Sequence, residues 1–386
     1  MLRGLITFYY HLLEKKCEEI PMKSIGKISV LHIVFLSMTV IGLKNHVTII
    51  PSLLNGAGRD SWMSVILAAL ITIPWLFIII YIQKQLQSDS IRMRLLENYP
   101  RIGNVIIYII VFYLLLMAAF TMRETLQWVS TTFLIETPVL LLFFFFSIVC
   151  ILLAVSSVYS LTMANVIVLF GVVIFGFFVA FVNMQIKDYK LLLPFFEHGF
   201  TPIIKTILYP VSGYFELLLL LFIQQHFKKK LNFKHLLIIL FILLGLTIGP
   251  LVGAITEFGP TEAAKQRYPA FEEWRIAKIG SFISHMDFFS IYQWLTGTFI
   301  RVGFLLFISI ELLGMTGQKK RIWETVAPAF IFLSLPLFLI NDSIFIEIKG
   351  KYFLVSTSLF FFILAFLFLF LLRKRSNNKV DRHASN

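Results

Sequence analysis

Several ionisable side chains of this sequence lie inside long apolar segments. The segment Ile28–Ile50 contains Lys44 and His46, and the segment Ile207–Phe227 contains Glu216. A charged side chain at the centre of a bilayer costs roughly 2.5–3.5 kcal/mol on insertion scales, so it normally faces a cavity or a partner. These residues are therefore the first candidates for contact with a solute, together with Arg123, Glu124, Arg301 and Glu311.

The same two apolar segments each contain residues that favour a break in a helix, Gly42-Leu43-Lys44-Asn45-His46 and Pro210-Val211-Ser212-Gly213-Tyr214. The N-terminal end of a half-helix attracts a carboxylate, and the C-terminal end attracts a cation or an ammonium group. Two broken helices in corresponding halves of a membrane protein indicate a solute site near mid-membrane. We expect unwound chain at Lys44 and at Ser212–Tyr214 to surround this site. We predict that this site is formed by Gly42, Lys44, Asn45, His46, Arg123, Ser212, Gly213, Tyr214, Glu216, Trp294 and Arg301.

Each of these residues also has a purely structural interpretation. Lys44 can pair with Glu216 and join two spans, or extend its amine toward the membrane surface. His46 can be an interior histidine with satisfied hydrogen bonds, Arg123 with Glu124 can be a solvated pair near a helix end, and Arg301 needs a partner in either case. Close packing between helices can explain the glycines and aromatic residues of the set, namely Gly42, Gly213, Tyr214 and Trp294.

The composition places these residues in a membrane protein. Of the 386 residues, 58% are hydrophobic and only 14% are charged, whereas about a quarter are charged in soluble domains. The net charge of +13 comes from basic residues in short loops beside apolar segments, so nucleic acid is not an expected partner. The sequence contains no phosphate-binding loop, zinc-protease motif or nucleophile elbow, and we expect neither an enzyme nor a cofactor or metal.

The apolar segments predict an all-α fold with ten spans. Basic residues are about twice as frequent in the loops on the side of the two termini, which predicts that both termini are cytoplasmic. We expect a cytoplasmic segment at 1–27, a membrane domain at 28–372 and a basic cytoplasmic tail at 373–386. The predicted spans are 28–50, 62–83, 102–128, 138–154, 160–183, 206–227, 235–257, 288–312, 325–345 and 352–372.

Two outer loops are longer than a turn. Residues 187–205 are expected to form an ordered hairpin, because Pro194 and Pro202 prevent a continuous helix. Within residues 258–287, apolar side chains from Phe271 to Met286 recur at steps of three and four, which predicts a helix that lies in the outer membrane interface or packs as a lid on the bundle.

Several stretches resemble one protein family. Ile41–Pro51 with Ala57–Trp62 resembles its first broken helix and the following turn, and Glu136-Thr137-Pro138 resembles the start of its fourth span. Asn183–Pro202 resembles its outer hairpin. Phe258–Pro269 and His285–Trp294 resemble the loop between spans seven and eight and the eighth span. The family is the B subunit of GerA-type spore nutrient germinant receptors, within the amino acid–polyamine–organocation superfamily.

The resemblance covers about residues 22–372, and it implies the five-plus-five inverted repeat of LeuT-like transporters, with helices 1 and 6 broken. The solute would bind between spans 1, 3, 6 and 8. It also implies a location in the inner membrane of the bacterial endospore, among membrane lipids and beside an A and a C subunit. The first break departs from the small residues of related permeases, because it contains Leu43-Lys44-Asn45-His46. This departure argues against ordinary sodium-coupled uptake.

Three functions are consistent with these features. The first is a nutrient-sensing subunit that binds an amino acid or a sugar and signals to its partners. The second is a proton-linked amino-acid permease in which Lys44, His46 or Glu216 carries the proton. The third is a scaffold with a vestigial cavity that assembles the receptor.

Overall fold

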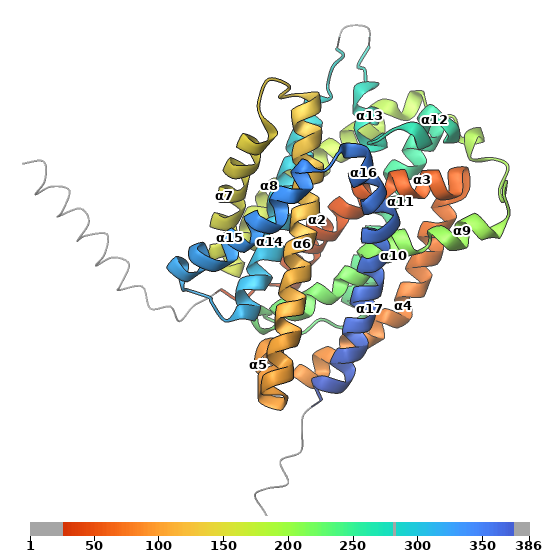
Figure 1. Ribbon diagram of the computed structural model, residues 1–386. Helices are drawn as coiled ribbons and strands as arrows, with labels where there is room; N and C mark the ends of the chain where they lie inside the picture. Colours follow the sequence, from red (N-terminus) through yellow and green to blue (C-terminus); the bar gives the residue numbers. More distant parts are fainter. Residues whose placement is uncertain (1–25, 281–282, 374–386) are drawn as a thin grey trace, which may run out of the picture.

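The chain folds almost entirely into helices, as the computed structural model in Figure 1 shows. The structure describes residues 26–280 and 283–373. Within these residues nine helices are long and apolar enough to cross a membrane, and α7 (Val139–Val155) is a shorter apolar helix. The prediction of an all-α polytopic membrane protein is therefore confirmed, whereas the five-plus-five repeat stays a prediction. Nearly all of the expected segments 1–27 and 373–386 lie outside the described residues.

The predicted spans correspond to the following elements. The first contains α2 (Val30–Leu43), the π-helix η1 (Lys44–Thr48) and α3 (Ile50–Ala57), and the sixth contains α9 (Phe200–Thr206), α10 (Leu208–Tyr214) and the 3-10 helix η5 (Phe215–His226). The tenth contains α16 (Asp342–Glu347), the π-helix η6 (Ile348–Phe353) and α17 (Leu354–Leu371). The other spans are α4 (Ser61–Leu86), α6 (Pro100–Thr132), α7, α8 (Val158–Val182), α11 (Phe233–Phe258), α14 (Phe288–Leu313) and α15 (Lys319–Leu339). Short helices connect them: η2 (Gly58–Asp60), α5 (Ile91–Asn98), η3 (Asn183–Gln185), η4 (Tyr189–Leu192), α12 (Pro260–Lys265) and α13 (Pro269–Arg275).

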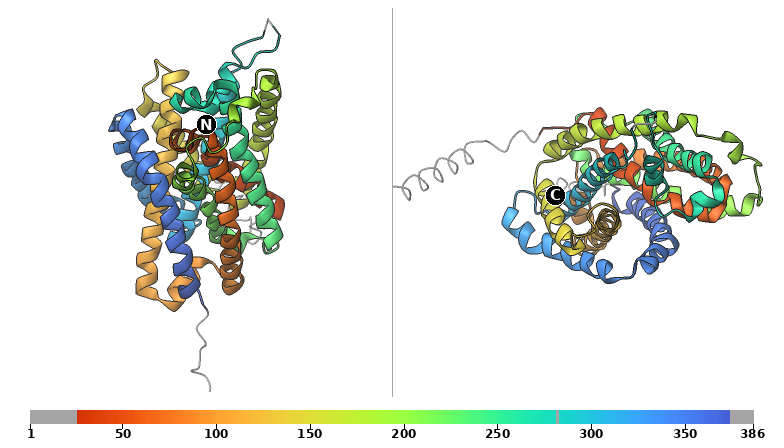
Figure 2. Two further views of the ribbon diagram at one scale, coloured as in Figure 1. Left: turned by 90° about the vertical axis from the view of Figure 1, so that its right-hand side faces the viewer. Right: turned by 90° about the horizontal axis from the view of Figure 1, so that it is seen from above.

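Four helical segments form the interior of the bundle. The buried share of the apolar segment is 83% in Phe200–His226, 78% in α14, 61% in Val30–Thr48 and 56% in α6, and it is at most 44% in the other long helices. Helix α14 packs against α2, α6, α7 and α8, and the view from above in Figure 2 shows the helices arranged around this interior. These four segments are the spans between which the family resemblance places the solute.

The first expected break is a change of helix type. From Lys44 the chain continues as a π-helix, and the Ile49 N–H donates to the Lys44 carbonyl, five residues earlier, at 3.2 Å. Single π turns within α-helices are frequent at functional sites. The α-helix is thus interrupted at the predicted place, but the expectation of unwound chain at Lys44 is wrong, because the chain keeps a helical hydrogen-bond pattern there.

The second expected break also stays helical. Pro210 is the third residue of α10, and the whole segment Pro210–Tyr214 lies within that helix. The N–H groups of a first helical turn have no partner in the helix, so proline is tolerated there. The geometry changes one residue later, at Phe215, where the chain tightens into the 12-residue 3-10 helix η5. A long 3-10 stretch within a span often marks a hinge.

The tenth span begins earlier than predicted. The sequence places Asp342–Lys351 in an outer loop or the preceding span, but α16, η6 and α17 follow one another without a gap from Asp342 to Leu371. The hydropathy of this segment is lowered by Lys349, Gly350 and Lys351. Because the tenth span begins at Asp342, Lys349 lies inside the bundle.

The outer hairpin is ordered by the turn that follows α3. The Asp60 carboxylate, which is 3% exposed, accepts the backbone N–H groups of Phe196 at 3.0 Å and Glu197 at 2.9 Å. Arg59 pairs with Glu197 at 2.7 Å and donates to the Leu193 carbonyl. The hairpin is therefore held by two adjacent residues that are far away in sequence.

Asp60→Asn is expected to loosen this hairpin. An asparagine amide can accept one of the two N–H groups, and hydrogen bonds to a charged acceptor contribute about 1.5–3 kcal/mol each. Limited proteolysis of the purified protein should cut between residues 193 and 199 faster in the variant. Glu136→Gln, in the exposed loop between α6 and α7, is the control. Equal cleavage of the hairpin in Asp60→Asn and the parent would contradict this account.

The loop between α11 and α14 is less helical than predicted. Helix α13 ends at Arg275, Gly280 has a φ of +59°, and Ile279 and Ile283 form an isolated antiparallel bridge. The continuous helix predicted by the apolar side chains from Phe271 to Met286 is therefore wrong, because the chain turns at the left-handed Gly280. Phe271 in α13 is buried beside Trp128 of α6, so α13 packs on the bundle.

Glu273 of α13 is expected to make stability depend on pH. Burial raises the pKa of the Glu273 carboxyl well above its ordinary value, the nearby Glu257 raises it further, and Lys187 opposes the shift. Because the folded-state pKa is raised, the stability from this group is full below the unfolded pKa. It is lost as the pH rises toward the folded pKa, at up to about 1.4 kcal/mol per pH unit.

The measurement is the thermal midpoint of the purified protein between about pH 5 and 8. Glu273→Gln should flatten the decline, because an amide does not titrate. The neighbouring Glu272→Gln is the matched control, since that side chain reaches solvent and pairs with Arg275. A decline that persists unchanged in Glu273→Gln would show that another group causes it.

Candidate functional site

Lys44, Glu216 and Arg301 form a buried ionic cluster, which we call the central triad. The Lys44 Nζ lies 2.9 Å from Glu216 Oε1, and Arg301 Nη1 and Nη2 lie 2.7 and 3.0 Å from Glu216 Oε2 and Oε1. Arg301 Nε also donates to Thr121 Oγ1 at 3.2 Å. All three residues of the triad are at most 3% exposed. The triad therefore joins η1, η5, α14 and α6, and the predicted pairing of Lys44 with Glu216 is present.

Two backbone carbonyls complete the bonds of the triad. Lys44 Nζ donates to the Ser212 carbonyl at 3.0 Å, and Arg301 donates to the Val40 carbonyl. At the end of α2 the Lys44 N–H bonds to the carbonyl of Ile41, three residues earlier. The Val40 carbonyl, which an α-helix would pair with Lys44, is thus available to Arg301. The irregular helix supplies a polar group to the site.

A second buried ion pair was missed by the sequence analysis. Lys349 of η6 pairs with Glu124 of α6, and the hydroxyl of Thr48 donates to the other Glu124 oxygen at 2.9 Å. Lys349 and Glu124 are 5% and 4% exposed. The one available signal was Glu124 itself, because a glutamate in an apolar segment requires a partner.

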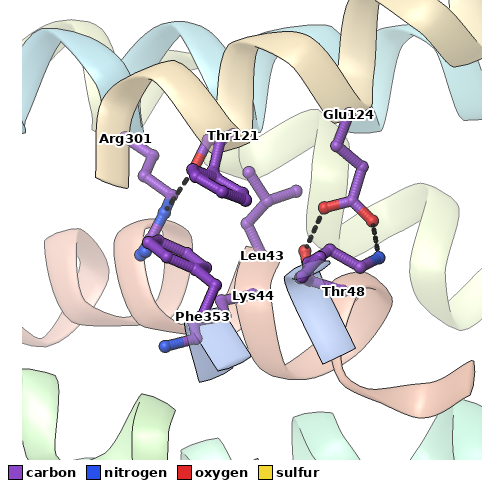
Figure 3. Close-up of a pocket in the computed structure, with 9 residues that line it drawn as sticks. Leu43, Lys44, Thr48, Thr121, Glu124, Arg301 and Phe353 are labelled. Carbon is purple, nitrogen blue, oxygen red and sulfur yellow. Dashed lines mark hydrogen bonds and ion pairs between the residues drawn. The ribbon is translucent and has the colours of Figure 1, made fainter. Parts of the chain in front are cut away.

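A small cavity lies between the triad and the Lys349–Glu124 pair. In Figure 3, Arg301 with Thr121 lies on one side, Glu124 with Thr48 on the other, and Leu43 between them. The space for water-sized solutes is about 20 Å³, enough for one or two water molecules. A nutrient-sized solute therefore requires lining side chains to move. The lining residues are Leu43, Lys44, Thr48, Phe120, Thr121, Glu124, Arg301, Lys349 and Phe353.

Asn45 and Gly213 meet beside the triad without lining this cavity. Asn45 is fully buried, and neither atom of its amide has a hydrogen-bond partner among the described residues. A Cβ on Gly213 would lie 1.7 Å from Asn45 Oδ1. The absence of a side chain at Gly213 is thus what makes room for Asn45.

Three other predicted residues face α11. His46 Nδ1 lies 3.1 Å from the Leu246 carbonyl, and the Tyr214 hydroxyl donates to Thr247 at 3.4 Å. A Cβ on Gly42 would lie 3.2 Å from the Leu246 side chain. These contacts agree with the structural interpretations of His46 and Gly42, and none of the three residues lines the cavity.

Arg123 and Trp294 lie toward the end of the bundle at which α13 packs (Figure 1). Arg123 donates to the Leu337 carbonyl at 2.9 Å, and its guanidinium lies 3.3 Å from Asp342 Oδ1. Trp294 stacks on Trp128 with ring centroids 4.2 Å apart, and its other neighbour is Tyr268 at 4.8 Å. Arg123 and Glu124 do not form the solvated pair of the structural interpretation, because both side chains are buried and each has a different ionic partner.

The opposite end of the bundle is closed by the described start of the chain. The Ile28 N–H donates to the His226 carbonyl, and the Lys228 N–H donates to the Ile28 carbonyl, both at 2.9 Å. Glu311 of α14 accepts from Gln225 at 2.6 Å. A second cavity of about 10 Å³ lies between this end and the triad, lined by Leu36, Ser37, Val40, Ile41, Glu216, Leu219, Leu220 and Phe304.

Comparison with known proteins agrees with this architecture. The profile of the family described as "Spore germination protein" matches residues 24–343. Spore germination protein XB of Bacillus anthracis is 39% identical over 342 residues, which cover 88% of this chain and 95% of that protein. Spore germination protein A2 of Bacillus subtilis is 25% identical over 293 residues, covering 72% and 76%. The chain thus belongs to the spore germination protein family.

Proposed function

We propose that this protein is the nutrient-sensing membrane subunit, the B subunit, of a spore germinant receptor. It binds a small nutrient of the amino acid or sugar class between spans 1, 3, 6 and 8 and signals to A and C subunits. Its membrane is the inner membrane of the endospore, with both termini cytoplasmic. The observation that carries the proposal is the buried triad, which joins spans 1, 6 and 8, beside a cavity lined by spans 1, 3, 8 and 10. A ligand shifts such a bundle only by its differential affinity for two states.

The irregular helices supply the part that moves. Lys44 and Glu216 belong to the π-helix η1 and the 3-10 helix η5, which have poorer hydrogen-bond geometry than an α-helix. The cavity is smaller than a nutrient, so binding requires the lining side chains of η1, α6, α14 and η6 to rearrange. We propose that this rearrangement of side chains is the signal that the A and C subunits detect.

Gly213→Ala tests the proposal. The added methyl group collides with Asn45, and overpacking of about 1–3 kcal/mol should raise the nutrient concentration for half-maximal germination about tenfold or more. The measurement is the loss of optical density of spores that carry the variant as their sole germinant receptor. Gly245→Ala is the control, because no atom lies within 4 Å of a Cβ at that position of α11. If Gly213→Ala spores germinate at the same nutrient concentration as the parent, the proposal fails and the scaffold function remains.

A proton-linked amino-acid permease is the second candidate. Glu216 lines the second cavity and bonds to Lys44 and Arg301, which line the first. A carboxylate between two water-sized spaces is suited to carrying a proton across the bundle. Liposomes that contain the purified protein and accumulate a labelled amino acid under a proton gradient would favour the permease. Germination in response to the same amino acid, without accumulation, would favour the receptor.

A further inference from the structure

The groups around the first cavity have one more positive than negative charge. Among the described residues, the lining contains Lys44, Arg301, Lys349 and Glu124, and Glu216 bonds to the first two. All five are at most 5% exposed. Charges buried in a medium of low dielectric constant are costly unless they are compensated. Glu124 balances Lys349, so the uncompensated charge belongs to the triad, where one carboxylate serves two cations.

The three cationic side chains, Lys44, Arg301 and Lys349, have more N–H groups than the acceptors they contact. A lysine offers three N–H groups and an arginine five. Among the described residues, Lys44 donates to Ser212 and Glu216, and Lys349 donates only to Glu124. Arg301 uses four of its five N–H groups. Each of the three cations therefore has at least one N–H without an acceptor among the described residues.

The outer ionic group of the bundle does not have this property. Arg123 and Arg267 share Asp342 and also carry an excess positive charge. However, the side chains of Arg267 and Asp342 are 30% and 32% exposed, so water and salt screen that charge. The excess at the first cavity has no comparable contact with solvent.

We infer that the first cavity binds a small solute with a net charge of −1, either a carboxylate or a halide ion. Lys44, Arg301 and Lys349 hold its negative charge. This inference rests on the proposed function and narrows its amino acid or sugar class to the anionic members, acidic amino acids and sugar acids. An anion compensates the excess charge and accepts the unused N–H groups, whereas a zwitterion or a neutral sugar leaves the charge uncompensated. A carboxylate solute fits once the lining side chains Phe120 and Phe353 turn aside.

The test uses four ligands of nearly equal size and different charge. Purified full-length protein in detergent is titrated with lactate, alanine, lactamide and alaninamide, and with chloride in a separate series, with the shift in thermal midpoint as the readout. Lactate should bind at least about tenfold more tightly than lactamide or alanine, and alaninamide should not bind. Competition between chloride and lactate would identify an inorganic anion as a second source of the same charge.

K44M removes the excess charge and should abolish the preference for lactate over lactamide. K320M is the matched control, because Lys320 is 90% exposed and its removal should leave the preference unchanged. Equal binding of lactate and lactamide by the parent, or the same preference in K44M, would overturn the inference. So would the failure of every anion to shift the midpoint. The proposed function is judged separately, because the Gly213→Ala spores report on the response to any nutrient.

Discussion

Glu216→Gln is expected to lower the free energy of unfolding by about 3–5 kcal/mol, since removal of one member of a buried ionic group leaves the others uncompensated. In this protein the change leaves Lys44 and Arg301 next to each other without a carboxylate, and both are 3% exposed. A glutamine oxygen can still accept one hydrogen bond, but it carries no charge. The measurement is the thermal midpoint and the denaturant midpoint of the purified protein in detergent.

A triple variant separates the charge effect from packing. K44M, E216L and R301M together replace the triad with apolar side chains, and such replacements of buried ionic groups are often neutral or stabilising. The triple variant should therefore unfold near the parent midpoint while the single variant unfolds well below it. The triple variant should also fail to respond to nutrient. A Glu216→Gln protein as stable as the parent would mean that the triad does not hold the four spans together.

The members of the triad could be predicted because their surroundings are visible in the sequence. Lys44, Glu216 and Arg301 lie within apolar segments, so each of them needs a partner, and only a few ionisable groups are available inside the spans. The burial of the first, third, sixth and eighth spans also agrees with the expected location of the site. The family resemblance is confirmed by a match over most of the chain.

Lys349 could not be predicted because it lies in a segment that resembles a loop. Lys349 and Lys351 flank a glycine and differ little in their sequence context, yet Lys349 is 5% exposed whereas the side chain of Lys351 is 65% exposed. Only the pitch of η6 decides which lysine faces Glu124. That pitch depends on tertiary contacts rather than on composition.

The type of helix at the two breaks could not be predicted from the sequence either. Glycine and proline predict that an α-helix is interrupted, but they do not say whether the chain unwinds, widens or tightens. At η1 the chain widens, and at η5 it tightens. The difference matters for the site, because a helical break presents selected carbonyls, such as those of Val40 and Ser212, to side chains. An open coil would present a longer row of unpaired groups to the solute.

Lys349→Met is expected to cost about 3–5 kcal/mol of stability, because it leaves the Glu124 carboxylate buried without a cation. Thr48 continues to donate to Glu124, so one hydrogen bond remains. Adding Glu124→Gln to this variant should restore most of the loss, since a neutral amide needs no compensating charge. Lys351→Met is the matched control, two residues away on the exposed side of the same π-helix, and should be close to neutral because exposed ion pairs contribute little.

The midpoints of the parent, Lys349→Met and the double variant form part of a double-mutant cycle across the cavity, and Lys351→Met is measured beside them as the control. A large cost in Lys349→Met, recovery in the double variant and no change in Lys351→Met would place the interaction between α6 and the tenth span, where it sets the outer wall of the cavity. If the double variant is as unstable as Lys349→Met, the loss comes from packing of the lysine stem rather than from the stranded carboxylate. In that case Glu124 would need another cation, and Arg123 is excluded because its guanidinium is held by Leu337 and Asp342.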